Sequence, residues 1–287
     1  MDWVDFPHFH PLKHRIMRLS LKVGALIGAL CLAASNASAV AVHDTSLFTN
    51  VLGANDDGST GLVNIGFSAN FYGTSYTQLY VNNNGNVTFE SPLSTFTPFG
   101  LSTNSFPIIA PFFADVDTRG AGSSPVTYGT GLIGGHQVFG VNWVDVGYFN
   151  SQADKLNSFQ LILIDRSDTG AGNFDIEFNY DRILWETGSA SGGSNGFGGT
   201  SAAAGYTDGG SNDFEFAGSR VNGAFLDSNL SSGLVHGSLN SNTAGQYIFT
   251  VRNGVVVNPN PVPEPASLAL LGLGLAGLAA ARRRTRS

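Results

Sequence analysis

The feature that most constrains the fold is the pattern of residues 40–262, where short apolar runs alternate with glycine, asparagine and aspartate and no helical period is sustained. A strand needs only a short run of this kind, whereas a helix needs a longer periodic one. We therefore predict an all-β domain of antiparallel strands, a β-sandwich whose two sheets close over Val, Ile and Phe. The predicted strands cover 62–67, 78–82, 86–90, 107–115, 125–128, 136–146, 157–165, 173–180, 213–216 and 246–252.

Turn residues predict how these strands connect. Asn-Asn-Gly at 83–85 predicts a tight hairpin, because glycine and asparagine accept positive φ values, and the sequence at 168–172 predicts a second turn. Pro107 and Pro111 lack a backbone N–H, so their strand is predicted to lie at a sheet edge or to contain a bulge. The Gly- and Ser-rich stretch 187–212 predicts a flexible insertion.

Residues 1–39 predict a secretory signal peptide, since a basic segment precedes an apolar run that ends in small residues. Ala37 and Ala39 provide the small side chains that signal peptidase requires, which places the cleavage after Ala39. Translation starts at Met1 or at Met17, because the shorter form also has a basic segment before the apolar run.

Cysteine content and charge exclude several function classes. The sole cysteine, Cys31, lies in the predicted signal peptide, so the mature chain has no disulfide, thiolate metal site or thiol nucleophile. Residues 40–262 contain six Lys or Arg against eighteen Asp or Glu, a formal charge of −12 that argues against nucleic acid as a partner. An export signal without disulfides fits a bacterial surface protein better than an animal matrix module.

The C-terminal segment 259–287 predicts a membrane stop. Residues 266–281 carry no charge and predict a transmembrane helix, slightly shorter than the ~17 to 25 residues of an ordinary span. A basic flank follows, formed by Arg282, Arg283, Arg284 and Arg286. The G-x-G-x-x-G spacing inside this run is not a dinucleotide fingerprint, because no strand precedes it and no acidic residue follows about 20 positions later.

Asp115 and Asp117 have two interpretations. On one strand they would project from the same face and, with carbonyls of the turn at 118–122, could bind calcium. Alternatively, Asp117 caps the turn and pairs with Arg119, while Asp115 accepts backbone amides at the sheet edge. We favour the structural interpretation and keep calcium as the alternative.

Other polar motifs are weaker. Asn-Asp-Asp-Gly at 55–58 is similar to the start of an EF-hand loop, but Gly66 stands where the final glutamate belongs, so a solvated turn is predicted. A Ser-His-Asp triad is disfavoured, because no G-x-S-x-G motif accompanies His43, His136 and His236. Further carboxylates without a predicted geometry are Glu90, Glu177 and Glu186.

Aromatic residues could form a platform that stacks on sugars, but most are expected in the core of a sandwich of this size. Trp143 is as compatible with the inside of the sheet as with the outside. The residues considered for the platform are Phe112, Phe113, Phe139, Trp143, Tyr148 and Phe149.

A series of blocks over residues 48–218 resembles the extracellular NIDO domain of nidogen-like proteins. In order, the blocks read LYVNNNGNVTFES, PIIAPFFADVDTRGAG, FGVNWVDVGYF, NSFQLILIDRS, FDIEFNYDRILWETG and AAAGYTDG. The resemblance implies a domain over 40–258 that belongs to a matrix or adhesion protein and brings no established catalytic residues.

The C-terminus resembles a second family pattern. Pro263, Glu264 and Pro265, followed by the apolar helix and the arginines, resemble the PEP-CTERM sorting signal of bacteria that make extracellular polysaccharide. The resemblance implies a transient membrane stop that an exosortase cuts near Pro-Glu-Pro, which releases the chain to the cell surface or the matrix.

These expectations define a function and its alternative. We expect an exported, non-catalytic bacterial surface or extracellular-matrix protein that adheres to polysaccharide or matrix proteins within a biofilm. Signal peptidase and exosortase are its expected partners during export, and no cofactor is expected unless calcium binds. The alternative is a secreted lectin or glycan-active enzyme with an acidic site near Asp115 and Asp117.

Overall fold

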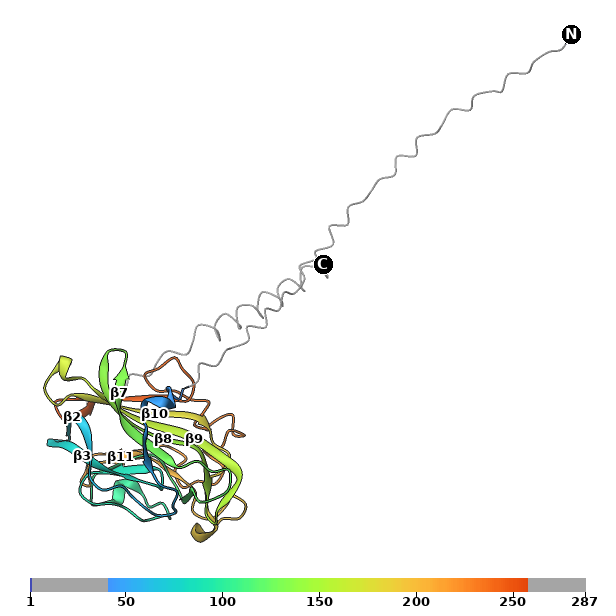
Figure 1. Ribbon diagram of the computed structural model, residues 1–287, viewed down its shortest axis with the longest axis horizontal. Helices are drawn as coiled ribbons and strands as arrows, with labels where there is room; N and C mark the ends of the chain where they lie inside the picture. Colours follow the sequence, from blue (N-terminus) through green and yellow to red (C-terminus); the bar gives the residue numbers. More distant parts are fainter. Residues whose placement is uncertain (2–40, 258–287) are drawn as a thin grey trace, which may run out of the picture. The chain divides into compact units, whose positions relative to one another are not determined.

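The computed structural model describes Met1 and residues 41–257, which form two antiparallel β-sheets (Figure 1). The predicted signal peptide, the predicted helix at 266–281 and the predicted sorting residues lie outside the described residues. Within the described part, the only helices are single 3-10 turns, and none is long and apolar enough to cross a membrane. These turns are η1 (Thr45–Leu47), η2 (Leu101–Thr103), η3 (Ser167–Thr169) and η4 (Ser189–Ser191).

The larger sheet has eight strands, and consecutive long hairpins form its centre. Its strands in spatial order are β1 (Asn50–Leu52), β7 (Val126–Ile133), β8 (His136–Tyr148), β9 (Gln152–Asp165), β10 (Phe174–Arg182), β13 (Gln246–Arg252) and β14 (Val255–Val257). The eighth strand, the short β6 (Val116–Asp117), pairs with β8 and is not part of this linear order. The prediction of a turn at 168–172 is confirmed, because η3 and this turn connect β9 to β10.

The smaller sheet has six strands. In spatial order they are β12 (Asp213–Glu215), β11 (Ala203–Thr207), β5 (Ile108–Phe113), β4 (Asn86–Thr88), β3 (Thr74–Asn82) and β2 (Val63–Phe71). The predicted hairpin at 83–85 is confirmed, with Asn82 opposite Asn86 across the turn. The chain leaves this sheet after β5 and enters the larger one at β6, so Ala114 and Asp115 form a crossover between the two sheets.

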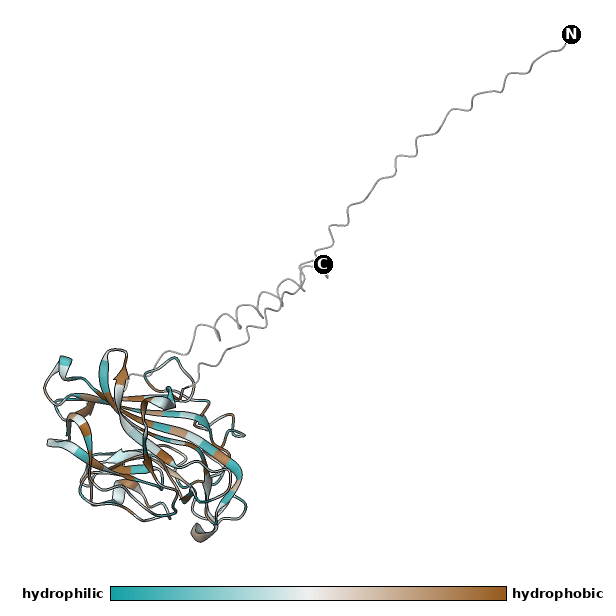
Figure 2. Ribbon diagram, in the orientation of Figure 1, coloured by the Kyte–Doolittle hydropathy of each residue, from teal (hydrophilic) through white to brown (hydrophobic). Residues whose placement is uncertain are grey.

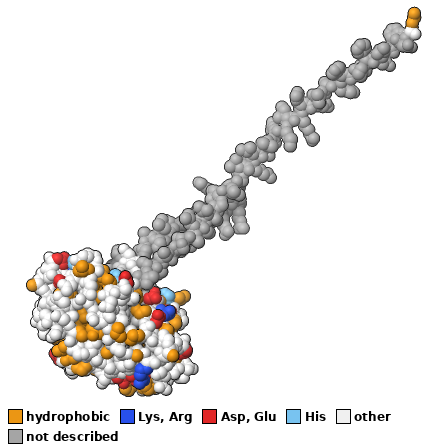
Figure 3. Space-filling view, viewed as in Figure 1, with side chains coloured by type: hydrophobic (Ala, Val, Ile, Leu, Met, Phe, Trp, Pro, Cys, Tyr) orange, Lys and Arg blue, Asp and Glu red, His pale blue; other side chains and the backbone are white. Residues whose placement is uncertain are grey.

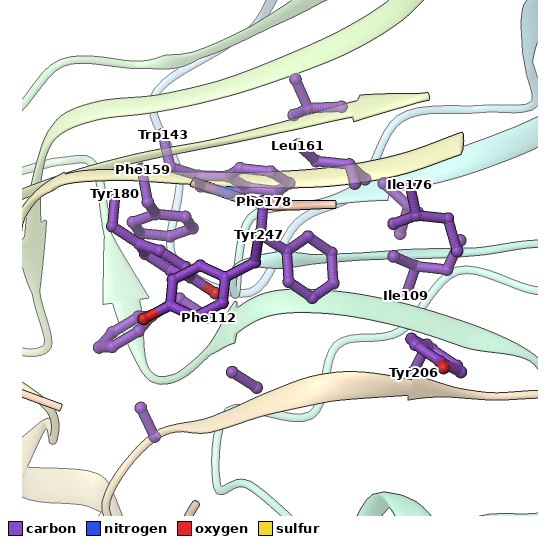
Figure 4. Packing of buried hydrophobic residues seen from close by; sticks show 14 of the residues in the cluster. Ile109, Phe112, Trp143, Phe159, Leu161, Ile176, Phe178, Tyr180, Tyr206 and Tyr247 are labelled. Carbon is purple, nitrogen blue, oxygen red and sulfur yellow. The ribbon is translucent and has the colours of Figure 1, made fainter. Parts of the chain in front are cut away.

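Aromatic side chains from both sheets fill the space between them (Figure 4). The indole of Trp143 on β8 stacks on Phe159 of β9 with ring centroids 5.3 Å apart, and Phe159 meets Phe112 of β5 at 5.1 Å. Trp143 is fully buried. Burial of each such side chain contributes roughly 1.5–3 kcal/mol, so this contact between the sheets is a major source of stability.

Hydropathy alternates along the strands that have one face in the core (Figure 2). On β13, Tyr247, Phe249 and Val251 are buried while the residues between them are partly exposed. This period of two is the signal from which the sequence predicts most strands. On the face shown in Figure 3, charged side chains are few and scattered, in keeping with a chain in which 12% of residues are charged.

Part of the predicted insertion at 187–212 is ordered as a strand, so this prediction is wrong there. Ala203–Thr207 form β11, which is wholly buried between β5 and β12. Its Ala and Gly residues carry little apolar signal, and the strand is defined by the neighbours that enclose it. The short strands β1, β6 and β14 were likewise not predicted.

The strand with Pro107 and Pro111 contains a bulge and is not at an edge. It begins after Pro107, and β5 lies between β11 and β4 inside the smaller sheet. The pairing of β11 with β5 shifts register at Pro111, because Ala203 is opposite Phe113 whereas Gly205 is opposite Ala110. Between these two pairs β5 has one residue more than β11, which is the bulge. The carbonyl of Pro111 instead accepts the hydroxyl of Tyr180 at 2.6 Å, which links the two sheets.

Candidate functional site

Three segments that are distant in sequence meet at one end of the sandwich. They are the loop after β1, the hairpin turn at 83–85 and the crossover that contains Asp115. The side-chain amide of Asn83 donates to the carbonyls of Asp56 and Val116, each at 2.6 Å. This turn therefore joins the loop to the crossover.

Asn84 extends this connection to a carboxylate. Its amide nitrogen donates to Oδ1 of Asp57 at 2.9 Å, and its Oδ1 accepts the N–H of Val116 at 3.0 Å. Gly85 completes the turn with φ of +74°, and a Cβ there would lie 1.8 Å from the carbonyl oxygen of Phe112. Only glycine fits this approach of the turn to β5, which explains the Asn-Asn-Gly sequence.

The three segments bring together Asp56, Asp57 and Asp115, which we call the acidic corner. One carboxylate oxygen from each residue lies within 4.8 Å of those from the other two. Asp56 and Asp57 are half-buried, whereas Asp115 is only 1% exposed. Among the described residues, no hydrogen-bond donor faces either carboxylate oxygen of Asp115, nor Oδ1 of Asp56.

The electrostatics of the acidic corner disfavour three negative charges. Burial raises the pKa of Asp115 to about 7, and the charges of Asp56 and Asp57 act in the same direction. The pKa of Asp56 rises to about 6, through burial and the charges of Asp117 and Asp57. Both shifts are the expected result of placing carboxylates together away from water.

Asp117 is outside the acidic corner and has partners for both oxygens. Its Oδ1 accepts the backbone N–H and Nε of Arg119, at 3.0 and 2.9 Å, and its Oδ2 accepts a guanidinium N–H of Arg119 at 2.7 Å and the N–H of Ser151 at 2.8 Å. Burial acts to raise the pKa of Asp117, but these hydrogen bonds hold it below the ordinary value. The cap and ion pair of the structural interpretation are thus present.

The sequence interpretation of Asp115 needs two corrections. Asp115 and Asp117 do not share a face of one strand, because Asp115 lies in the crossover and Asp117 on β6. The carboxylate of Asp115 also accepts no backbone amide from the described residues, although its main-chain carbonyl accepts the N–H of Phe149 at 3.1 Å. Asp115 and Asp117 are only two residues apart, yet the carboxylate of Asp117 is fully hydrogen-bonded and that of Asp115 has no donor among the described residues.

The predicted solvated turn at 55–58 is more ordered than expected. Oδ1 of Asn55 accepts the N–H of Gly58 at 2.6 Å, and the backbone N–H and carbonyl of Asn55 bond to Thr118. This anchoring directs Asp56 and Asp57 toward the crossover. Sequence reasoning missed their role because it tested the motif only as an EF-hand, and the partner Asp115 lies far along the chain.

Within the described residues, none of the candidate histidines bonds to a serine hydroxyl, so no Ser-His-Asp triad is assembled there. Nε2 of His43 is 2.7 Å from Oε1 of Glu177, and Nε2 of His236 is 2.7 Å from a main-chain carbonyl. Glu186 accepts the backbone N–H groups of Gly223 and Phe225. The other candidates lie apart, with His136 at the start of β8 and Glu90 exposed after β4.

The aromatic platform considered for sugar binding is mostly part of the core. Phe149 is half-buried, and the other five residues are buried, namely Phe112, Phe113, Phe139, Trp143 and Tyr148. Trp143 also uses its indole N–H internally, on the carbonyl of Asn83 at 3.0 Å. The five buried rings are not available to stack on a sugar at the surface.

Two family patterns and several known proteins match parts of this sequence. The nidogen-like domain family matches residues 77–253, and the PEP-CTERM protein-sorting motif matches residues 261–284. Alpha-tectorin of Mus musculus and of Homo sapiens are each 35% identical over 195 residues, which cover 58% of this chain and 9% of the relative. Nidogen of Drosophila melanogaster is 33% identical over 146 residues, 42% of this chain and 11% of the relative.

These matches relate one domain of each larger protein to this chain. The chain spans only about a tenth of the length of the curated relatives named above, and no solved structure matches it. The family match covers more than half of the chain and includes both sheets of the sandwich from β3 to β13. The chain therefore belongs to the nidogen-like domain family and carries a PEP-CTERM protein-sorting motif after that domain.

Proposed function

We propose that this chain is an exported, non-catalytic protein of a bacterial cell surface or extracellular matrix, where its nidogen-like domain adheres to polysaccharide or matrix proteins. The observation that carries the proposal is the order of the two matches, a nidogen-like domain at 77–253 followed by a sorting motif at 261–284. A sorting motif concerns delivery, so the function outside the cell is assigned to the domain.

The proposed route of export is supported by the residue patterns of 1–39 and 259–287. Signal peptidase would cut after Ala39, and the helix at 266–281 would hold the precursor in the inner membrane through its arginine flank. An exosortase would then cut near Pro263, Glu264 and Pro265 and release the domain. The corresponding division into 1–39, 40–258 and 259–287 is part of this proposal.

The first test is the intact mass of the protein in membrane, surface-polysaccharide and medium fractions of its host. We expect a mature chain from Val40 to about Pro263–Pro265 outside the cell. Glu264→Ala should leave the precursor in the membrane fraction, whereas Glu90→Ala, an exposed glutamate of the domain, should be delivered normally. Normal delivery of Glu264→Ala, and of a variant with the four C-terminal arginines replaced by glutamine, would refute the sorting route.

Adhesion needs a separate test. The released protein should sediment with the host's purified exopolysaccharide or matrix, and cells that lack it should form weaker biofilms. A correctly delivered protein that binds neither fraction would leave the export route in place and contradict the adhesive role.

A further inference from the structure

Buried acidic side chains in the described residues almost all have partners. Five are buried, namely Asp115, Asp117, Asp175, Glu177 and Glu186. Asp117 and Asp175 pair with arginines. Glu177 accepts one hydrogen bond from Gln246 and faces His43, and Glu186 accepts two backbone N–H groups. This domain thus follows the general rule that a buried charge is paired or binds a metal.

Asp115 is the exception among these five. It is 1% exposed, neither of its oxygens has a hydrogen-bond donor among the described residues, and its nearest ionisable neighbours include two further carboxylates. An unpaired buried carboxylate costs several kcal/mol, and neighbouring negative charges add to that cost. A cation from solution removes both penalties together.

We propose that Asp56, Asp57 and Asp115 bind one calcium ion at the acidic corner. Calcium binds oxygen ligands at about 2.3–2.6 Å, so ligands on opposite sides of one ion are about 4.8 Å apart. The three carboxylate oxygens lie within 4.8 Å of one another and therefore fit a single coordination shell. This inference rests on the geometry of the domain and does not depend on the proposed export or adhesion.

The hydrogen bonds at the corner hold the carboxylates and leave oxygens for the ion. Asn84 occupies Oδ1 of Asp57, and Arg119 donates to Oδ2 of Asp56 at 2.9 Å, while Oδ1 of Asp56 has no donor among the described residues. Asp117 is not a ligand, since Arg119 and Ser151 occupy both of its oxygens. The calcium pair considered from sequence is therefore revised, with Asp115 retained and Asp117 replaced by Asp56 and Asp57.

The donor set selects the class of metal. Oxygen-only ligands favour a hard cation, and the corner contains neither histidine nor cysteine. Three carboxylates around one ion suit calcium, because magnesium keeps several waters and is usually held by one or two carboxylates. The three negative charges, with Arg119 as the nearby positive one, match a divalent ion.

The test is a calcium titration of the purified full-length chain after treatment with EDTA and its removal. Isothermal titration calorimetry with CaCl2 should give one site, with a Kd of about 0.1–1 mM as in other extracellular modules. Calcium at 10 mM should raise the Tm by about 5 °C. Asp57→Asn should weaken binding at least tenfold, whereas Asp213→Asn, an exposed aspartate on β12, should bind like the wild type.

Asp115→Asn separates a ligand from a merely structural residue. Without calcium this variant should have a higher Tm than the wild type, because the buried charge is gone, and with calcium the order should reverse. A lower Tm for Asp115→Asn under both conditions would overturn the proposal. The same applies if the wild type binds no calcium, if Asp57→Asn binds it as tightly, or if MgCl2 stabilises the wild type equally.

Discussion

Asp115 and Asp175 are buried aspartates of the same domain with opposite surroundings. Asp175 on β10 has an arginine at each oxygen, Arg252 at 2.7 Å and Arg166 at 2.9 Å. Asp115 has none, and its nearest acidic neighbours are Asp56 and Asp57. The two sites differ in how the fold supplies their neighbours.

The neighbours of Asp175 come from the sheet. Arg252 ends β13 and Arg166 directly follows β9, and these are the two strands that pair with β10. Strand register thus delivers both cations to one carboxylate. The neighbours of Asp115 come from the loop after β1, and the amides of Asn83 and Asn84 hold this loop beside the crossover that contains Asp115. Strand pairing therefore places a countercharge at each oxygen of Asp175, whereas the loop brings two further carboxylates to Asp115.

The largest loss of stability is expected at Asp175, whose two arginine partners come from the neighbouring strands of the sheet. Replacing both Arg166 and Arg252 by glutamine should lower the free energy of unfolding by about 3–5 kcal/mol, because Asp175 is then buried without a countercharge. Urea denaturation measures this loss. Arg220→Gln is the matched control, since its pair with Glu215 is at the surface and should contribute less than about 1 kcal/mol. If Arg220→Gln lowered the free energy of unfolding as much as the double substitution, the arginines at Asp175 would have no special role in stability.

A smaller loss of stability is expected at the acidic corner, which loops hold together. Asn84→Ala should cost about 2 kcal/mol, because the turn loses the side-chain hydrogen bonds of Asn84 to Val116, Asp57 and Thr95. It should also weaken calcium binding, since Asp57 loses the amide that positions it. Urea denaturation and calorimetry give the two values, with the exposed Asn212→Ala as control. Unchanged calcium affinity in Asn84→Ala would show that the turn does not organise the acidic corner.

The smallest effect is expected at the pair formed by His43 and Glu177. The hydrogen bond to Glu177 raises the pKa of His43 above its ordinary value of 6.5, although burial opposes this shift. The protonated form therefore contributes stability that is fully present below pH 6.5 and is lost as the pH rises through the folded-state pKa. Relative to His43→Gln, the wild type should lose about 1 kcal/mol between pH 6 and 9.

Urea denaturation across this pH range provides the check for His43. His136→Gln is the matched control, because His136 makes no side-chain hydrogen bond within the described residues. If the wild type and His43→Gln changed in parallel with pH, the ion pair with Glu177 would not contribute to folding.

Most of the fold could be predicted from the sequence, because its signals are local. The period of two and the Asn-Asn-Gly turn depend on adjacent residues, and they predict β3, β4 and the long strands of the larger sheet. Strand β11 was missed because Ala203–Thr207 is small and Gly-containing, and only the flanking strands bury it. From the sequence, the strand with Pro111 was predicted to lie at a sheet edge or to contain a bulge. The pairing with β11 decided for the bulge.

The sequence by itself determined the all-β class, the acidic character and the family, since these depend on composition and on motifs in a fixed order. Only the tertiary structure decided which acids meet. Asp115 and Asp117 are two residues apart and diverge, because the chain changes sheets between them. Asp56 and Asp57 are far from Asp115 in sequence and join it, because the turn at 83–85 binds both segments. Carboxylates interact across a few ångströms of space, and separation along the chain does not measure that distance.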